Sequence, residues 1–157
     1  MKLTAIAATL LLTALVTAAL PSKTSAATLT VDCTPQTGSF PVTASGFGPG
    51  ATTAGEVLYK FYPCEKLAHL FLPALYGPSN ATTFSAGPLP TFLIPATIPY
   101  QEHIVTGFDN GVEQAPIMVR LSAGSSTLIY ARDGDISGWT PTGSKGVGLQ
   151  VITVFLD

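Results

Sequence analysis

Glycine and proline occur so often along this chain that they limit the elements it can form. There are fifteen glycines and thirteen prolines in 157 residues. Each proline fixes φ and lacks a backbone N–H donor, which interrupts a helix. The runs between them are short and rich in Val, Ile, Thr, Phe and Tyr, which suit a pleated, half-buried surface. The pattern therefore predicts short β-strands rather than long helices.

Alternation of apolar and polar residues locates these strands. In residues 56–62, Val57, Tyr59 and Phe61 lie on one face and Leu58, Lys60 and Tyr62 on the other. Asp109-Asn110-Gly111 predicts a hairpin turn, since Asn-Gly readily adopts positive φ. Only residues 64–72 suit a short helix, and residues 147–156, apolar on both faces near their end, suit a central strand. The further expected strands are 27–33, 40–45, 82–86, 91–94, 102–108, 116–121 and 126–132.

Eight or nine short strands at this spacing predict an all-β fold. The two architectures that fit are an antiparallel β-sandwich and a small barrel. No internal repeat or linker divides the chain. We therefore expect one domain, spanning residues 27–157.

The first 26 residues have the pattern of a secretory signal peptide. Lys2 precedes an apolar run to about Leu20, and a polar stretch with Pro21 leads to small residues ending at Ala26. The alternative is an uncleaved anchor, but a run of about 18 residues rich in Ala and Thr is close to the lower limit for crossing a bilayer. We expect a cleaved signal, a secreted, extracellular protein and no stable membrane anchor.

Two cysteines and a low charge characterise the exported part. Cys33 and Cys64 are the only cysteines, and such a pair usually bonds in an oxidising compartment. The alternatives are two buried free thiols or a redox or metal role. Residues 27–157 hold five basic and nine acidic residues, a net charge of −4. Such a surface has no basic patch for phosphate backbones, so we expect no nucleic-acid partner.

Residues 67–101 contain no Asp, Glu, Lys or Arg, although six prolines exclude a membrane-spanning helix there. One interpretation is core strands joined by stiff loops. The other is an apolar surface that binds a lipid, a wall polymer or a protein. Asn80 begins an Asn-Ala-Thr sequon, a candidate glycosylation site if the source is a eukaryote. The candidate apolar binding surface comprises Phe71, Leu75, Tyr76, Phe92 and Ile94.

Few residues suggest catalysis or metal binding. His69 and His103 are 34 positions apart, without a ligand-spaced partner. Asp133 and Asp135 flank a glycine as in short calcium loops, but too few oxygen ligands follow, so a plain turn is favoured. We expect no cofactor, no metal site and no catalytic residue.

One segment carries a family resemblance. Residues 35–38 read Pro-Gln-Thr-Gly, and residues 40–51 read Phe-Pro-Val-Thr-Ala-Ser-Gly-Phe-Gly-Pro-Gly-Ala. This resembles the opening of secreted immunoglobulin-like domains, where a Pro-x-x-Gly corner precedes a strand and a Gly-Phe-x-Pro-Gly turn. The chain departs from antibody-type domains because Trp139 follows both cysteines. The resemblance implies a sandwich and no particular activity.

Three functional hypotheses follow. The first is a secreted, non-catalytic protein acting by surface contact, either associated with a cell wall or interacting with a host as an effector or virulence protein. The second is a carrier of an apolar small ligand or lipid, with residues 67–101 lining its pocket. The third is an unrecognised secreted hydrolase using His103 and Asp133. The expected partners are accordingly a wall polymer, a host protein or an apolar ligand.

Overall fold

The computed structural model of this chain describes residues 32–132 and 138–157. The expected signal peptide, most of the expected strand 27–33 and the Asp133-Gly134-Asp135 turn lie outside the described residues. The elements are β1 (Gln36–Ser45), β2 (Ala54–Tyr62), β3 (Leu67–Leu72), β4 (Leu75–Pro78), β5 (Phe84–Gly87), the 3₁₀ turn η1 (Thr91–Leu93), β6 (Tyr100–Asp109), β7 (Val112–Ser122), β8 (Leu128–Arg132), β9 (Ser144–Val147) and β10 (Gln150–Phe155).

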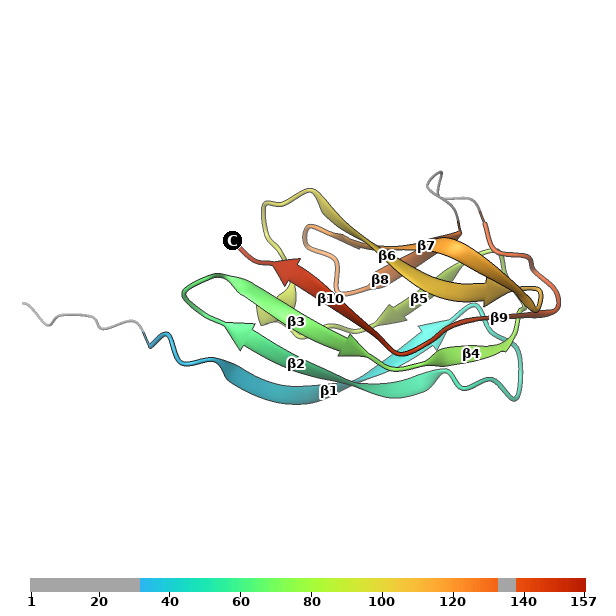
Figure 1. The fold of residues 1–157 in the computed structure, drawn as a ribbon, viewed down its shortest axis with the longest axis horizontal. Coiled ribbons are helices and arrows are strands. Elements are labelled where there is room, and N and C mark those ends of the chain that lie inside the picture. Colours follow the sequence, from blue (N-terminus) through green and yellow to red (C-terminus); the bar gives the residue numbers. More distant parts are fainter. Residues whose placement is uncertain (1–31, 133–137) are drawn as a thin grey trace, which may run out of the picture. The chain divides into compact units, whose positions relative to one another are not determined.

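These strands form one antiparallel sheet with the order β10-β3-β2-β1-β5-β8-β7-β6-β9-β4. β1 pairs with β2 along most of its length but with β5 only through Thr43, Ala44 and Ser45. This short pairing divides the sheet into two halves. Strands β10, β3, β2 and β1 form the first half, and β5, β8, β7, β6, β9 and β4 form the second (Figure 1).

A buried side chain joins the two halves on the side away from the β1–β5 pairing. The side-chain amide of Gln101 on β6 donates from Nε2 to the carbonyl oxygen of Phe155, at 2.6 Å. Its Oε1 accepts from the backbone N–H of Phe155, at 2.7 Å. The amide of Gln101 thus forms the two hydrogen bonds with Phe155 that a neighbouring strand would form. Because these bonds link β6 to β10, which lie in opposite halves of the strand order, the sheet is curled. The prediction of a single all-β, antiparallel domain is confirmed.

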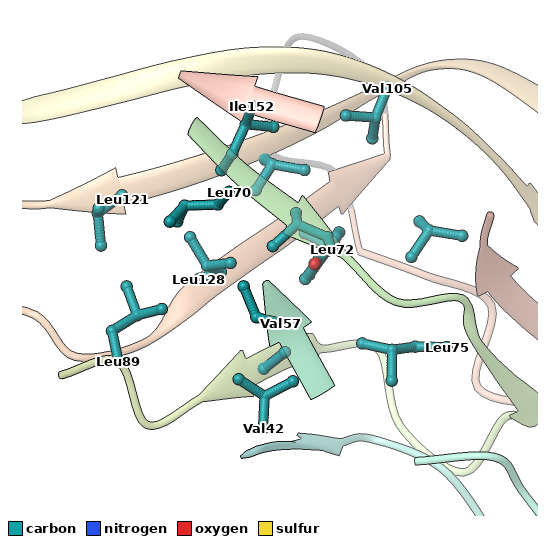
Figure 2. Close-up of a cluster of buried hydrophobic side chains, with 14 of the residues drawn as sticks. Val42, Val57, Leu70, Leu72, Leu75, Leu89, Val105, Leu121, Leu128 and Ile152 are labelled. Carbon is teal, nitrogen blue, oxygen red and sulfur yellow. The ribbon is translucent and has the colours of Figure 1, made fainter. Parts of the chain in front are cut away.

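The inner faces of the two halves supply the hydrophobic core. Val57, Leu70 and Ile152 project from the first half, and Leu121 and Leu128 from the second; all are buried. Figure 2 shows these side chains pointing toward one another. Because side chains alternate between the faces of a strand, the inward positions are apolar in both halves.

The disulfide and the tryptophan occupy different environments. Cys33 and Cys64 are bonded, as predicted, and both are exposed. Trp139 is buried; its ring lies edge-on to Phe84, and its Nε1–H donates to the carbonyl oxygen of Tyr130 at 2.8 Å. The chain therefore does not pack its tryptophan on its disulfide, as antibody-type domains do.

The expected helix at residues 64–72 is wrong. Within β3, Ala68, Leu70 and Leu72 are buried while Phe71 is exposed, a period of two residues. β3 pairs with β2 on one side and β10 on the other, so its backbone groups find partners in both neighbours. This pairing overrides the helix propensity of Leu and Ala.

Two expected strands also differ from the structure. Residues 147–156 break at Gly148 and Leu149 into β9, which pairs with β4 and β6, and β10, which pairs with β3. β10 ends the strand order and is not central. In residues 91–94, the 3₁₀ turn η1 replaces the expected strand. Pro90 and Pro95 flank this segment and cannot donate to a strand ladder.

The hairpin turn between β6 and β7 is confirmed. Asn110 has φ 51° and Gly111 φ 75°, and Asp109 pairs with Val112 across the turn. Two consecutive residues with positive φ are the requirement of a type I′ turn, and Asn-Gly meets it at low cost.

Replacing both Cys33 and Cys64 by Ser is expected to lower the free energy of unfolding by about 2–4 kcal/mol. The bond closes a loop between residues 31 positions apart, and opening it enlarges the unfolded ensemble. Urea denaturation followed by circular dichroism measures the change. A reducing agent should lower the wild-type midpoint equally and leave the double variant unchanged. Equal midpoints for oxidised wild type and variant would contradict the prediction.

Candidate binding surface

Three apolar side chains form a row across the outer face of the first half of the sheet. Leu58 on β2 is opposite Phe71 on β3, and Phe71 is opposite Val151 on β10. They are 54%, 45% and 57% exposed. Each alternates with a core residue of its own strand, so the fold directs all three away from the core. We call Leu58, Phe71 and Val151 the outer row.

A hollow lies on each side of the outer row, and Leu58 and Phe71 line both. The first, about 420 Å³, extends toward Pro73 and Leu149. The second, about 450 Å³, extends over β1 toward Thr37 and Ser39 and includes Lys60. Both hollows lie on the outer face, and the interior between the halves is filled by the core (Figure 2). The outer row is therefore a ridge between two shallow depressions.

Opposite charges flank the outer row along β2. Glu56 and Lys60 lie two positions either side of Leu58, and both are exposed. Glu56 makes no ion pair with any residue that the structure describes. The Lys60 ammonium lies 5.2 Å from the centre of the Tyr62 ring, a cation–π contact. The outer row is thus bordered by one acid and one base.

The structure does not bring the five predicted surface residues together. Phe71 belongs to the outer row, and Tyr76 is exposed on β4. Phe92 on η1 is also exposed, but its ring packs edge-on against Tyr59, which projects from β2 into the core side. Ile94 is half-buried against the core.

Leu75 is fully buried and does not belong to a binding surface. The absence of charge in residues 67–101 identified an apolar segment, but it could not distinguish the positions that point into the core from those that point outward. Leu58 and Val151 lie outside that segment and were missed. The signal for Leu58 was present in residues 56–62, where it falls on the face opposite Val57.

His69 and His103 lie on opposite faces of the sheet. His69 on β3 faces outward, and its Nδ1 lies 3.0 Å from Thr153 Oγ1. His103 on β6 alternates with the exposed Ile104 and shares the inner face with Val105. Its Nε2 is buried without a hydrogen-bond partner among the described residues. Burial lowers the pKa of His103 below its usual 6.5. The two histidines do not form one site.

A buried polar network in the second half was not predicted. Asp109 accepts from Arg132 Nη1 at 2.8 Å, from the Thr140 hydroxyl at 2.8 Å and from the Thr140 N–H at 3.1 Å. Lys145 is opposite Asp109 on β9 and fully buried. Burial lowers the pKa of Lys145, and the charge of Asp109 opposes this.

Lys145 holds the segment between β4 and β5. Its ammonium donates to the carbonyl oxygens of Ala81 and Thr83, at 2.7 and 2.8 Å, and lies 5.3 Å from the centre of the Phe47 ring. Two of its three N–H donors are occupied by backbone carbonyls, so the contacts support a structural role. Asn80, the sequon residue, is exposed in this segment, and its Nδ2 donates to the carbonyl oxygen of Phe47 at 2.8 Å.

Comparison with protein-family models and with curated proteins found no match. Across the described ranges 32–132 and 138–157, no helix has the length and apolar character needed to cross a membrane. Within the same ranges, no three His, Cys, Asp or Glu side chains gather in a metal-binding arrangement.

Acidification is expected to destabilise the fold through His103. Because burial holds its pKa below 6.5 in the folded chain, the unfolded chain binds the proton more readily. Stability from this group is fully present above pH 6.5 and falls as pH decreases through the lowered folded pKa. Urea midpoints measured from pH 7.5 downward should show this loss well before aspartates, with a usual value of 3.8, become protonated.

The variant His103→Gln separates this effect from others, because it cannot titrate. Its urea midpoint should stay nearly constant between neutral and mildly acidic pH, where the wild-type midpoint falls. A midpoint that falls with pH in the His103 variant as steeply as in the wild type would refute the assignment.

Proposed function

We propose that this chain is a secreted, non-catalytic protein that acts by contact with a protein partner outside the cell, through the outer row. The observation that carries the proposal is the register of Leu58, Phe71 and Val151, which aligns three exposed apolar side chains across three strands. These positions add nothing to the core. Because they are about half exposed, burying the rest of each against a partner would contribute about 1 kcal/mol, roughly half the value for a fully exposed side chain.

The exported location is supported by two features. The disulfide is exposed on the surface, and such bonds persist in oxidising compartments. The first 26 residues have the composition of a signal peptide. Contact at a cell wall or with a host is consistent with such a protein, whose partner it would meet outside the producing cell.

The flatness of the face favours a protein over a small ligand. Carriers usually enclose most of an apolar ligand's surface, whereas the hollows of 420 and 450 Å³ lie on the outer face and share one ridge. Their sizes still fit a small apolar molecule, so a carrier function is the second candidate. It predicts saturable binding of a fluorescent fatty acid that is displaced by an unlabelled one.

An immunoglobulin-like fold is part of the proposal. Residues 36–45 of the segment that resembles such domains form β1, and Gly46 and Gly50 adopt positive φ in the turn that follows. This supports the resemblance at its strand and at its turn. Such sandwiches commonly serve as contact modules, although their fold alone implies no activity.

The variant Leu58→Thr/Phe71→Thr is expected to reduce binding to the surface of the producing or host cells by about tenfold or more. Threonine keeps the β propensity while removing apolar area, and 1.4 kcal/mol corresponds to tenfold in affinity. Binding of the labelled chain to intact cells, titrated by flow cytometry, measures the effect. The thermal unfolding midpoint should change little, because both side chains are exposed.

Ile104→Thr is the matched control, since Ile104 is 78% exposed on the outer face of the second half. It should bind as wild type. Protease treatment of the cells should abolish binding, because the proposed partner is a protein. Equal binding by all three chains, or binding that resists protease, would refute the proposal.

A further inference from the structure

The outward positions of β2 follow a self-complementary order. Glu56, Leu58 and Lys60 project from the same face, with the acid and the base at equal distances from Leu58. Residues two apart on a strand are about 7 Å apart. A half-turn about an axis through Leu58, lying in the plane of the face and across the strands, exchanges the positions of Glu56 and Lys60.

We propose that the partner of the outer row is a second copy of this chain. The inference rests on the proposed function, because it uses the same surface. With the two-fold axis along the row, Leu58, Phe71 and Val151 each meet their own counterpart. Glu56 of each copy then faces Lys60 of the other, so two ion pairs border the apolar contact. Isologous interfaces require this kind of self-complementarity.

The geometry of sheets permits this contact. Two sheets pack face to face at about 10 Å with strands aligned within about 30°. In the proposed pair, β2 lies over β2 of the copy with the opposite direction. The two-fold axis places the first hollow of each copy opposite the second hollow of the other, and Glu56 and Lys60, which line these hollows, meet between them.

The charges of this face are available for such pairing. Glu56 has no ion-pair partner among the residues described, and Lys60 is exposed. The outer face of the second half differs, since Glu102 there accepts from Arg120 Nε at 2.8 Å within the same chain. Residues 27–157 carry a net charge of −4, but this face carries one charge of each sign near its centre. A copy therefore meets local attraction rather than repulsion.

Charge reversal tests the two-fold arrangement directly. In Glu56→Lys or Lys60→Glu, like charges face one another across the axis at two places. Each single variant is expected to raise the dissociation constant of the dimer by about tenfold. The double variant Glu56→Lys/Lys60→Glu exchanges the charges, restores both pairs and should bind within about threefold of wild type. Sedimentation equilibrium of the full chain over a range of concentrations measures all four constants.

Leu58→Thr provides a second test of the interface, because it removes apolar area on the axis without altering charge. It should also raise the dissociation constant of the dimer. Thermal midpoints close to wild type will show that each exposed substitution leaves the fold intact. A chain that is monomeric at all concentrations overturns the inference, as does a double variant as weak as the singles.

The outcome is separable from that of the proposed function. If the chain is monomeric but its binding to cells still depends on Leu58 and Phe71, a second copy is the wrong partner and the contact role stands. If the charge-swapped variant restores the dimer but no variant alters binding to cells, the dimer stands and the contact with other proteins is refuted.

Discussion

The packing of one half of the sheet on the other is the constraint on which the rest of this structure depends. β1 meets β5 through three residues only, and the sheet folds over so that Val57 and Leu70 face Leu121 and Leu128 across a filled core. Each strand alternates its side chains, so this packing determines every inward position. The same alternation leaves the outward positions free of any role in the core. An apolar residue at an outward position therefore needs another explanation than folding.

Polar side chains form hydrogen bonds with backbone groups that strand pairing leaves without partners. Gln101 bonds both backbone groups of Phe155, which gives β10 hydrogen bonds on the side where no strand pairs with it. Lys145 and Asp109 are buried on neighbouring strands, yet Asp109 pairs with Arg132 and Lys145 donates to main-chain carbonyls. Buried polar groups cost stability unless they are hydrogen-bonded. Their arrangement in the second half explains why that half can hold charge in its interior while the first half carries its charges outside.

Local sequence signals predicted the features that depend on near neighbours. The alternation in residues 56–62 placed both faces of β2 correctly, and Asn110-Gly111 located a turn. Features set by distant pairing were missed. Residues 64–72 suggested a helix, but most of them form β3, because their backbone groups pair with β2 and β10. Leu75 and Phe71 belong to the same uncharged segment, yet Leu75 is buried and Phe71 is exposed. This difference follows from their positions in the sheet. The outer row joins positions 58, 71 and 151, which no local pattern can connect.

The open edge of β1 is a poor place for contact with a partner. A strand edge can recruit an added strand, and β1 has an open edge before it meets β5. The N–H of Ala44 donates to Thr53 in the β1–β2 hairpin, so alternate residues face β2 and Pro41 directs its nitrogen to the open edge. Lacking an N–H there, Pro41 weakens that edge as a template, a common protection of edge strands. Core side chains fill the interior between the two halves, and Pro41 weakens the open edge of β1. The outer face of β2, β3 and β10 thus combines apolar area, adjoining hollows and unpaired charge in one place.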